Sequence, residues 1–220
     1  MAKRKRIDEK LFYRKKAERQ ANIKVPRKRI LIVCEGEKTE PNYFKSIVKT
    51  IPRGIVKVDI LGEGYNTLSL IDFTITKRDE QNRKALNCSI TLPYDEVWAV
   101  FDRDSFKPDD FDNAIDKAKA NEIICSYSNE AFELWYLLHF AYFNTGIIRK
   151  QYKRLLTKYF GEKYEKNSTN RFEKLQKLGN QELAIRNAIK LYKKWDHRSP
   201  AKENPSTTVY LLVEKLNSYK

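Results

Sequence analysis

Acidic side chains follow two apolar stretches that lie far apart in the chain. Residues 30–34 lead directly into Glu35, and residues 97–101 lead directly into Asp102 and, two positions further on, Asp104. In an open parallel sheet the carboxyl ends of the strands line one crevice, so we expect these three carboxylates to converge there. Because oxygen ligands suit Mg²⁺ and Mn²⁺, the pattern predicts a site for one of these cations.

A divalent cation at such a site suits phosphoryl chemistry. It can polarise a phosphoryl oxygen, lower the pKa of a bound water and stabilise the leaving oxygen of an in-line displacement. The i, i+2 spacing lets Asp102 and Asp104 point towards one ion, so we interpret both as metal ligands of a catalytic site. Glu35 could be a further ligand or a general base. A purely structural role is the alternative, since acidic residues at strand ends often cap the following helix.

Two further glutamates, Glu130 and Glu133, stand one helical turn apart at an expected helix start. Either could complete a second metal site, although acidic residues there also interact favourably with the helix dipole when no metal is bound. We rank Glu37 and Glu40 below these two as ligands.

Several basic residues are candidates for contact with nucleic acid. Lys38 and Arg103 adjoin the acidic positions and could meet a phosphate, or could simply offset the neighbouring charges. Arg198 and Lys202 lie in a basic loop that could follow a nucleic-acid backbone or remain solvated. His139 sits in an apolar stretch, where we expect a buried structural histidine rather than a catalyst.

The elements that would position these residues alternate between strand and helix. Strands are expected at residues 29–34, 55–61, 96–101 and 123–126, with helices at 40–49, 67–83 and 109–121. From residue 129 onward the pattern is helical, including 147–159, 170–195 and 206–218. Four strands alternating with helices predict an α/β fold with a mostly parallel, four-stranded sheet flanked by helices.

Composition narrows the class of protein. The 220 residues are 33% charged and 41% hydrophobic, and no apolar run approaches the roughly 18 residues of a membrane span. The basic start lacks the apolar stretch of a secretion signal. Three cysteines without CxxC spacing and two histidines favour neither a disulfide framework nor a zinc site. We therefore expect a soluble, cytoplasmic protein.

Charge divides the chain into three parts. Residues 1–28 have a net charge of +9, residues 29–144 of −5 and residues 145–220 of +11. We interpret these as a basic N-terminal arm, an α/β core, and a basic helical extension packed on the core. The basic flanks would attract a polyanion, whereas the acidic middle would repel it unless metal ions neutralised the carboxylates. Basic flanks could alternatively serve solubility or contact with another protein.

Four segments of the chain together resemble a known family. They are residues 32–44 (IVCEGEKTEPNYF), 100–104 (VFDRD), 128–140 (SNEAFELWYLLHF) and 204–209 (NPSTTV). A strand ending in Glu-Gly and a later strand ending in Asp-x-Asp are similar to the Toprim domain, and the four segments together resemble the RloB family. The resemblance covers residues 29–216.

The resemblance implies a Toprim-like, Rossmann-like fold and a metal-dependent nuclease that cleaves DNA or RNA. It further implies an effector of anti-phage defence, similar to the AbiLii component of abortive-infection systems, with an ABC-type or AAA-type ATPase partner. Glu35 matches the Toprim glutamate, and Asp102 and Asp104 match its metal-binding pair. Where the family often has proline this chain has Glu130, which leaves open whether Glu130 or Glu133 is the further ligand.

Other classes of protein fit less well. A DxD glycosyltransferase would leave Glu35 and Gly36 without a role, and a haloacid-dehalogenase-type phosphatase carries its aspartates after the first strand. A topoisomerase needs more domains than 220 residues allow, and the zinc-binding cysteines of a bacterial primase are missing. A second hypothesis remains, namely a non-catalytic module that docks nucleic acid or an ATPase. These motifs distinguish neither DNA from RNA as the substrate nor one oligomeric state from another.

Overall fold

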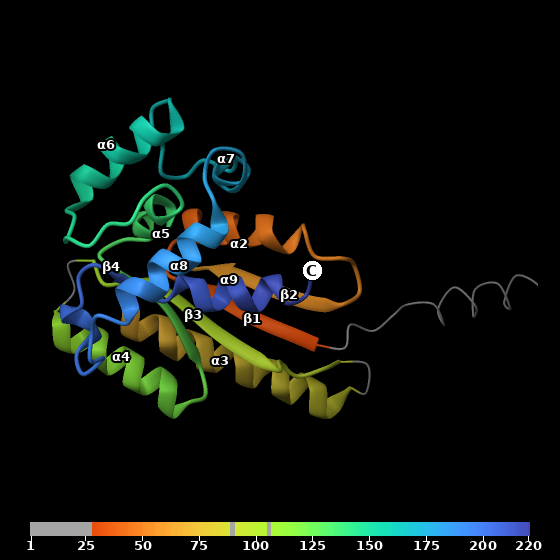
Figure 1. Ribbon diagram of the computed structural model, residues 1–220. Coiled ribbons are helices and arrows are strands. Elements are labelled where there is room, and N and C mark those ends of the chain that lie inside the picture. The colour runs from red at the N-terminus through yellow and green to blue at the C-terminus, as the bar shows by residue number, and fades with distance from the viewer. Residues whose placement is uncertain (1–27, 89–90, 105–106) are drawn as a thin grey trace, which may run out of the picture.

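A five-stranded sheet forms the centre of the protein. The computed structural model describes residues 28–88, 91–104 and 107–220 (Figure 1). Neighbouring strands follow the order β2-β1-β3-β4-β5; the first four are parallel to one another, and β5 runs antiparallel to β4. The strands are β1 (Lys28–Cys34), β2 (Val56–Gly62), β3 (Glu96–Asp102), β4 (Ile124–Asn129) and β5 (Ser206–Thr207).

Helices cover both faces of this sheet. They are α2 (Thr39–Val48), α3 (Thr67–Asn87), α4 (Pro108–Ala120), α5 (Glu133–Leu138), α6 (Arg149–Phe160), α7 (Arg171–Leu178), α8 (Gln181–Tyr192) and α9 (Val209–Asn217), with a 3₁₀ turn at Pro200–Lys202. In Figure 1, α3 and α4 lie on one side of the sheet and α2, α5, α8 and α9 on the other, while α6 and α7 lie further out. The predicted α/β fold with a mostly parallel sheet flanked by helices is confirmed.

The central strand β1 explains why two layers form. Its apolar run is buried on both faces, as is usual for a parallel strand between two others. Because side chains alternate along a strand, Ile30 and Ile32 enter the hydrophobic layer under α2, α5 and α9. Leu31 and Val33 enter the opposite layer, beneath α3 and α4.

The sheet has one strand more than the sequence predicted. Ser206 and Thr207 were expected at the start of the last helix, but they pair with the free edge of β4 instead. The hydroxyl groups of Ser128 and Thr207 lie 2.9 Å apart, and the Thr208 N–H donates to the Tyr127 carbonyl at 2.8 Å. Pairing with β5 provides partners for backbone N–H and C=O groups of β4 that an edge strand would leave unpaired. The helix α9 therefore begins only at Val209.

The single helix expected over residues 170–195 is also wrong, because the chain breaks into α7 and α8. A Cβ on Gly179 would lie 2.9 Å from the Cβ of His139, so glycine lets the break pass close to that residue. The Asn180 N–H then donates to the His139 carbonyl at 3.0 Å. The Asn180 side chain caps α8 by accepting from the Leu183 N–H at 2.8 Å.

Residues 1–27, which include most of the proposed basic arm, lie outside the described residues. The division into arm, core and extension stays a prediction; within the described part, Leu212 and Leu216 of α9 share a hydrophobic layer with Ile30 of β1. Among the described helices, none combines the length and the apolar character needed to cross a bilayer.

Candidate active site

Asp102 is the last residue of β3 and lies at the carboxyl end of the parallel sheet. Strand alternation places Trp98, Val100 and Asp102 on the same face, the one covered by α2 and α5. The Asp102 side chain is consequently directed into the protein rather than into solvent, and the residue is only 8% exposed. Burial of a carboxylate is costly unless nearby groups compensate for it.

Glu35 is held beside Asp102 by the backbone of the central strands. The Glu35 N–H donates to the Val100 carbonyl at 2.8 Å, and the Glu35 carbonyl accepts from the Gly64 N–H at 2.9 Å. Its side chain turns towards β3, where Oε2 accepts a hydrogen bond from the Asp102 N–H at 3.0 Å. The two strand ends therefore bring Glu35 and Asp102 together, as the sequence predicted.

Two more buried glutamates approach Asp102 from the covering helices. Glu40 lies in the first turn of α2 and Glu133 in the first turn of α5; they are 5% and 7% exposed. Glu35, Glu40, Asp102 and Glu133 are called the acid cluster below. The Glu40 Oε2 atom is buried and has no hydrogen-bond partner among the described residues. A Cβ on Gly36 would collide with that atom, so glycine makes room for the Glu40 carboxyl group.

Mutual repulsion and burial raise the pKa values in the acid cluster. Burial is the largest cause for Asp102, whose pKa lies well above its usual value, and the charges of Glu40, Glu133 and Glu35 add to it. Burial raises the pKa of Glu40 as well, with Glu133 adding to the shift and Lys166 and Arg149 opposing it. So close a set of carboxylates requires bound protons or a cation.

Glu35 has a pKa near neutrality. Burial raises it to about 7, supported by the charges of Glu40 and Asp104, while the hydrogen bond from Asp102 and the charge of Arg149 oppose the shift. A carboxyl group with this pKa is partly ionised at physiological pH, so it can both accept and release a proton there.

Asp104 and Glu130 lie at the margin of the acid cluster rather than within it. Asp104 has a positive φ of 43°, and its carboxylate pairs with Arg149 Nη2 at 2.8 Å. Its N–H donates to the Glu130 carbonyl at 3.2 Å, which ties the ends of β3 and β4 together. Both Glu130 and Glu133 act on the Tyr152 hydroxyl, but of these two only Glu133 is among the charges that raise the pKa of Asp102. Of the two residues that the sequence left open, Glu133 is the one in the cluster.

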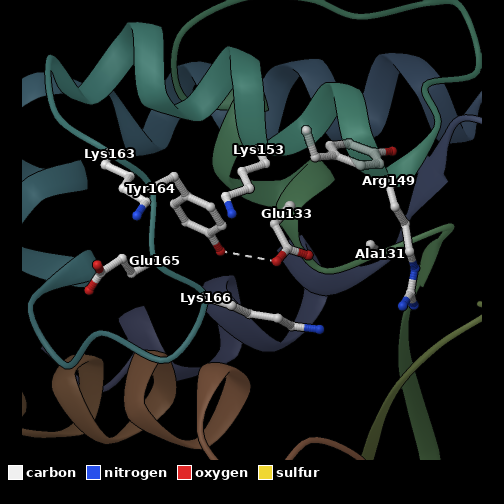
Figure 2. Close-up of a pocket in the computed structure, with 9 residues that line it drawn as sticks. Ala131, Glu133, Arg149, Lys153, Lys163, Tyr164, Glu165 and Lys166 are labelled. Atoms are coloured by element: carbon white, nitrogen blue, oxygen red, sulfur yellow. Dashed lines mark hydrogen bonds between the residues drawn. The ribbon is translucent and has the colours of Figure 1, made fainter.

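A cavity of about 420 Å³ opens beside the acid cluster. We call it the cationic cavity, and Figure 2 shows its lining. The residues that line it are Ala131, Glu133, Arg149, Tyr152, Lys153, Lys163, Tyr164, Glu165 and Lys166. Tyr164 Oη donates to Glu133 Oε1 at 3.0 Å, shown as the dashed line in the figure. Glu133 therefore belongs to both the acid cluster and the cationic cavity.

The four basic residues singled out from the sequence do not line this cavity. Lys38 is exposed just before α2, and Arg103 follows β3 with Nη1 donating to the Asp104 carbonyl at 3.2 Å. Arg198 and Lys202 are exposed on the loop beside α4, and Arg198 lies next to Asp196. A role for these residues in binding nucleic acid stays a prediction.

His139 is buried, as the sequence predicted. It is 2% exposed, its Nδ1 lies 2.9 Å from the Trp135 carbonyl oxygen, and its ring packs edge-on against the Trp135 ring. Burial lowers its pKa to about 4, so it is neutral at physiological pH. Packing accounts for this residue without chemistry.

Sequence reasoning ranked Glu40 below Glu130 and Glu133 as a ligand, although the structure places it in the acid cluster, and it did not identify the cationic cavity. The available signal for Glu40 was its place in a first helical turn, directly before Pro41 and after the strand-Glu-Gly segment. The basic lining residues come from α6 and from the turn that follows it, and they match no motif. Only the packing of these segments over α5 brings them beside Glu133.

The donor atoms of the acid cluster are of the type that hard divalent cations prefer. They are carboxylate oxygens, at least one of which is buried without a partner. Within the described ranges, no three acidic, histidine or cysteine side chains already stand in the arrangement of a metal-bound set. The side chains thus lie within electrostatic reach of one another without forming a ready-made coordination shell.

Comparison with known protein families gives a match. A family model described as RloB-like protein matches residues 30–216. Neither the curated proteins nor the solved structures contain a match to the chain. The matched range includes the whole acid cluster and every residue that lines the cationic cavity.

Proposed function

The chain belongs to the RloB-like family, and we propose that it is a metal-dependent nuclease of the Toprim type that hydrolyses phosphodiester bonds of DNA or RNA. The observation that supports this most strongly is the acid cluster. Four carboxylates from three separate segments of the chain meet at the carboxyl end of the sheet, where three of them are almost fully buried.

A cation offers the simplest compensation for this arrangement. Buried carboxylates that repel one another are stabilised when a divalent ion replaces their protons. Mg²⁺ and Mn²⁺ accept oxygen ligands of this kind, and Glu40 has an oxygen atom without a partner. Glu40, Asp102 and Glu133 would hold the cation, with Glu35 either as a further ligand or as a base.

The residues of the chain have distinct roles in the proposed reaction. When bound, the metal would supply a Lewis acid that activates water and stabilises the leaving oxygen. Glu35, with a pKa of about 7, can take a proton from the attacking water at neutral pH. Arg149, whose guanidinium pairs with Asp104 at the edge of the cationic cavity, can bind a phosphate oxygen of the substrate.

The finer description of the fold and the biological setting belong to the same proposal. A glutamate after β1 and an Asp-x-Asp sequence at the end of the adjacent β3 are consistent with a Toprim-like sheet. The family resemblance leads us to propose a cytoplasmic effector of anti-phage defence that works with an ABC-type or AAA-type ATPase. Co-purification of the chain with such an ATPase from a host that encodes both would test that partnership.

Metal uptake and cleavage together test the enzymatic proposal. We expect purified protein to bind Mn²⁺ or Mg²⁺ in calorimetric titration and to cleave labelled DNA or RNA only in the presence of the metal. Asp102→Asn should abolish metal uptake and lower the cleavage rate by about 100-fold or more, because it removes a buried charge from the acid cluster.

Glu214→Gln serves as the control because Glu214 is an exposed carboxylate on α9, outside the acid cluster. It should bind metal and cleave as the unaltered protein does. Cleavage that persists in Asp102→Asn would refute the proposal. Salt-sensitive binding of nucleic acid with neither metal uptake nor cleavage would instead establish the alternative, a non-catalytic binding module.

A further inference from the structure

The cationic cavity has the composition of a phosphate-binding site. Four cationic side chains line it, against the two carboxylates of Glu133 and Glu165. In Figure 2 the Lys153 and Lys166 side chains lie on opposite sides of the hydrogen bond between Tyr164 and Glu133. Among the described residues, Lys153 and Lys163 form no ion pair, so their ammonium groups are available to a ligand. Lysine and arginine in this number favour a polyanionic ligand.

One wall of the cavity is a turn of the chain that hydrogen bonds and ring packing hold in place. Gly161, with a φ of 67°, ends α6 and turns the chain back. The returning turn is fixed because the Tyr164 N–H donates to Thr157 Oγ1 at 3.0 Å, and because Thr39 Oγ1 donates to the Lys166 carbonyl at 3.1 Å. The Arg171 guanidinium, which is 4% exposed, packs over the Tyr164 ring. This turn therefore holds one wall of the cavity against α6.

A buried hydroxyl group, that of Tyr152, belongs to the cavity wall. Tyr152 is 2% exposed, and its hydroxyl forms no hydrogen bond of normal geometry with any described residue. Burial raises its pKa, and the charges of Glu130, Asp102 and Glu133 add to this shift while the nearby Glu130 backbone opposes it, so the group is protonated at physiological pH. A protonated hydroxyl can donate a hydrogen bond to a phosphate or sugar oxygen.

The size of the cavity limits what can enter. A volume of about 420 Å³ is in the range of small-molecule pockets, roughly 300–1,000 Å³. A sphere of this volume is roughly 9 Å across. A DNA duplex is wider than its own major groove, which is about 12 Å wide, so it is also wider than this cavity. One nucleotide unit fits this space, but a paired duplex does not.

We propose that the cationic cavity binds a single unpaired nucleotide unit of the substrate through its phosphate, so that the protein acts on single-stranded nucleic acid or on single-stranded ends. The inference rests on the proposed function, because it takes the ligand to be nucleic acid. Glu133, which lies in both sites, places the cavity directly beside the acid cluster. A strand bound in the cavity would therefore present its adjoining phosphodiester to the carboxylates.

Binding measured without cleavage tests the cavity by itself. Fluorescence anisotropy would compare a labelled single-stranded 12-mer, as DNA and as RNA, with a blunt duplex of the same sequence, in EDTA. We expect the single strand to bind at least about tenfold more tightly than the duplex. The DNA and RNA arms show which sugar the site prefers, and preference for either one supports the proposal.

The decisive variant is Lys153→Ala combined with Lys163→Ala. It should weaken single-strand binding by about tenfold and reduce the slope of log affinity against log salt by about 1.4, as expected for two lost phosphate contacts. Lys158→Ala combined with Lys177→Ala is the matched control, since both are exposed lysines on α6 and α7 that do not line the cavity. This control should change affinity by less than about twofold, and thermal unfolding should show that both variants are folded.

Several results would overturn the inference. They are no binding of any nucleic acid, equal or tighter binding of the duplex, or the same affinity in the cavity variant and in the control. Failure of the nuclease proposal would look different: strands would bind in a lysine-dependent manner without any metal-dependent cutting. Conversely, cleavage that ignores the cavity lysines would leave the nuclease proposal standing and refute the cavity as the substrate site.

Discussion

At the scale of single residues, Glu40 shows how burial and repulsion combine at one position. The residue is 5% exposed, and its carboxyl group lies near Glu133 and Asp102 and has one oxygen without a hydrogen-bond partner among the described residues. The charges of Lys166 and Arg149 and the local backbone favour its ionised form. Protein without metal is therefore expected to keep protons in the acid cluster that an unfolded chain would release.

Stability of the metal-free protein should consequently fall as pH rises. The pKa of Glu35 is about 7 in the folded protein, against an ordinary value of 4.5, so between these values the folded state binds more protons than the unfolded state. The free energy of unfolding should decrease across this window by at most about 3 kcal/mol from Glu35. The stabilising contribution is complete below pH 4.5 and lost above about pH 7.

Urea unfolding at a series of pH values in EDTA measures this effect. Glu35→Gln should flatten the decrease between pH 4.5 and 7, because glutamine does not titrate, whereas Glu214→Gln should leave it unchanged. A profile of equal steepness in Glu35→Gln and the unaltered protein would contradict the assigned pKa.

Gly36 offers a way to disturb Glu40 without touching a carboxylate. In Gly36→Ala the new methyl group would collide with the end of the Glu40 side chain, which is flexible and can move aside. The free energy of unfolding should change by only about 1 kcal/mol, while the heat of Mn²⁺ binding in calorimetry should fall sharply. Metal uptake at the original affinity would show that Glu40 is not a ligand.

Gly62→Ala is the informative comparison for Gly36→Ala. A Cβ at Gly62 would lie 2.7 Å from the Gly36 carbonyl oxygen and 2.9 Å from that of Glu37, and the backbone cannot move aside as a side chain can. This variant should lose stability by about 1–3 kcal/mol in the same unfolding assay.

At the scale of elements, the sequence predicted the parallel strands well because each has a strong local pattern. The apolar runs before Glu35 and Asp102 match β1 and β3 closely. The two-residue strand β5 has no such pattern, since its place is decided by pairing with β4 far away in the chain. The break between α7 and α8 was written locally, in Gly179 and Asn180, but the helical spacing on both sides concealed it.

Asn180 should stabilise the start of α8 measurably. Its side chain accepts a hydrogen bond from the Leu183 N–H at 2.8 Å, so Asn180→Ala should lower the free energy of unfolding by about 1 kcal/mol. Asn170→Ala is the matched control, because Asn170 precedes α7 without a side-chain cap. Equal losses in the two variants, measured by urea unfolding, would argue against the assigned cap.

At the scale of the whole molecule, the acidic and basic regions of the sequence correspond to two adjacent sites in the structure. The acidic residues 29–144 supply the entire acid cluster, whereas residues 145–220 supply all four cations of the cationic cavity. Sequence alone could show that two oppositely charged regions exist. It could not show that Arg149 and Lys166 reach Glu40, because that depends on how α6 and its following turn pack over α5.

Residues 1–27 carry 11 basic and 3 acidic side chains and should add to nucleic-acid binding by long-range attraction. Protein that lacks them should bind a labelled strand more weakly and with a smaller salt dependence. Mn²⁺ uptake in calorimetry should be unaffected, since no residue of the acid cluster belongs to this segment. Unchanged affinity for the strand would show that this segment does not contact nucleic acid.

Glu133 belongs to both the acid cluster and the cationic cavity, and this shared residue couples binding at the two sites. Any ligand in the cavity experiences the charge of Glu133, and any ion held by the cluster alters that charge. The two equilibria are then thermodynamically linked, and linkage is reciprocal: the factor by which metal tightens strand binding equals the factor by which the strand tightens metal binding. Through this one carboxyl group, the affinity of each site would depend on whether the other site is occupied.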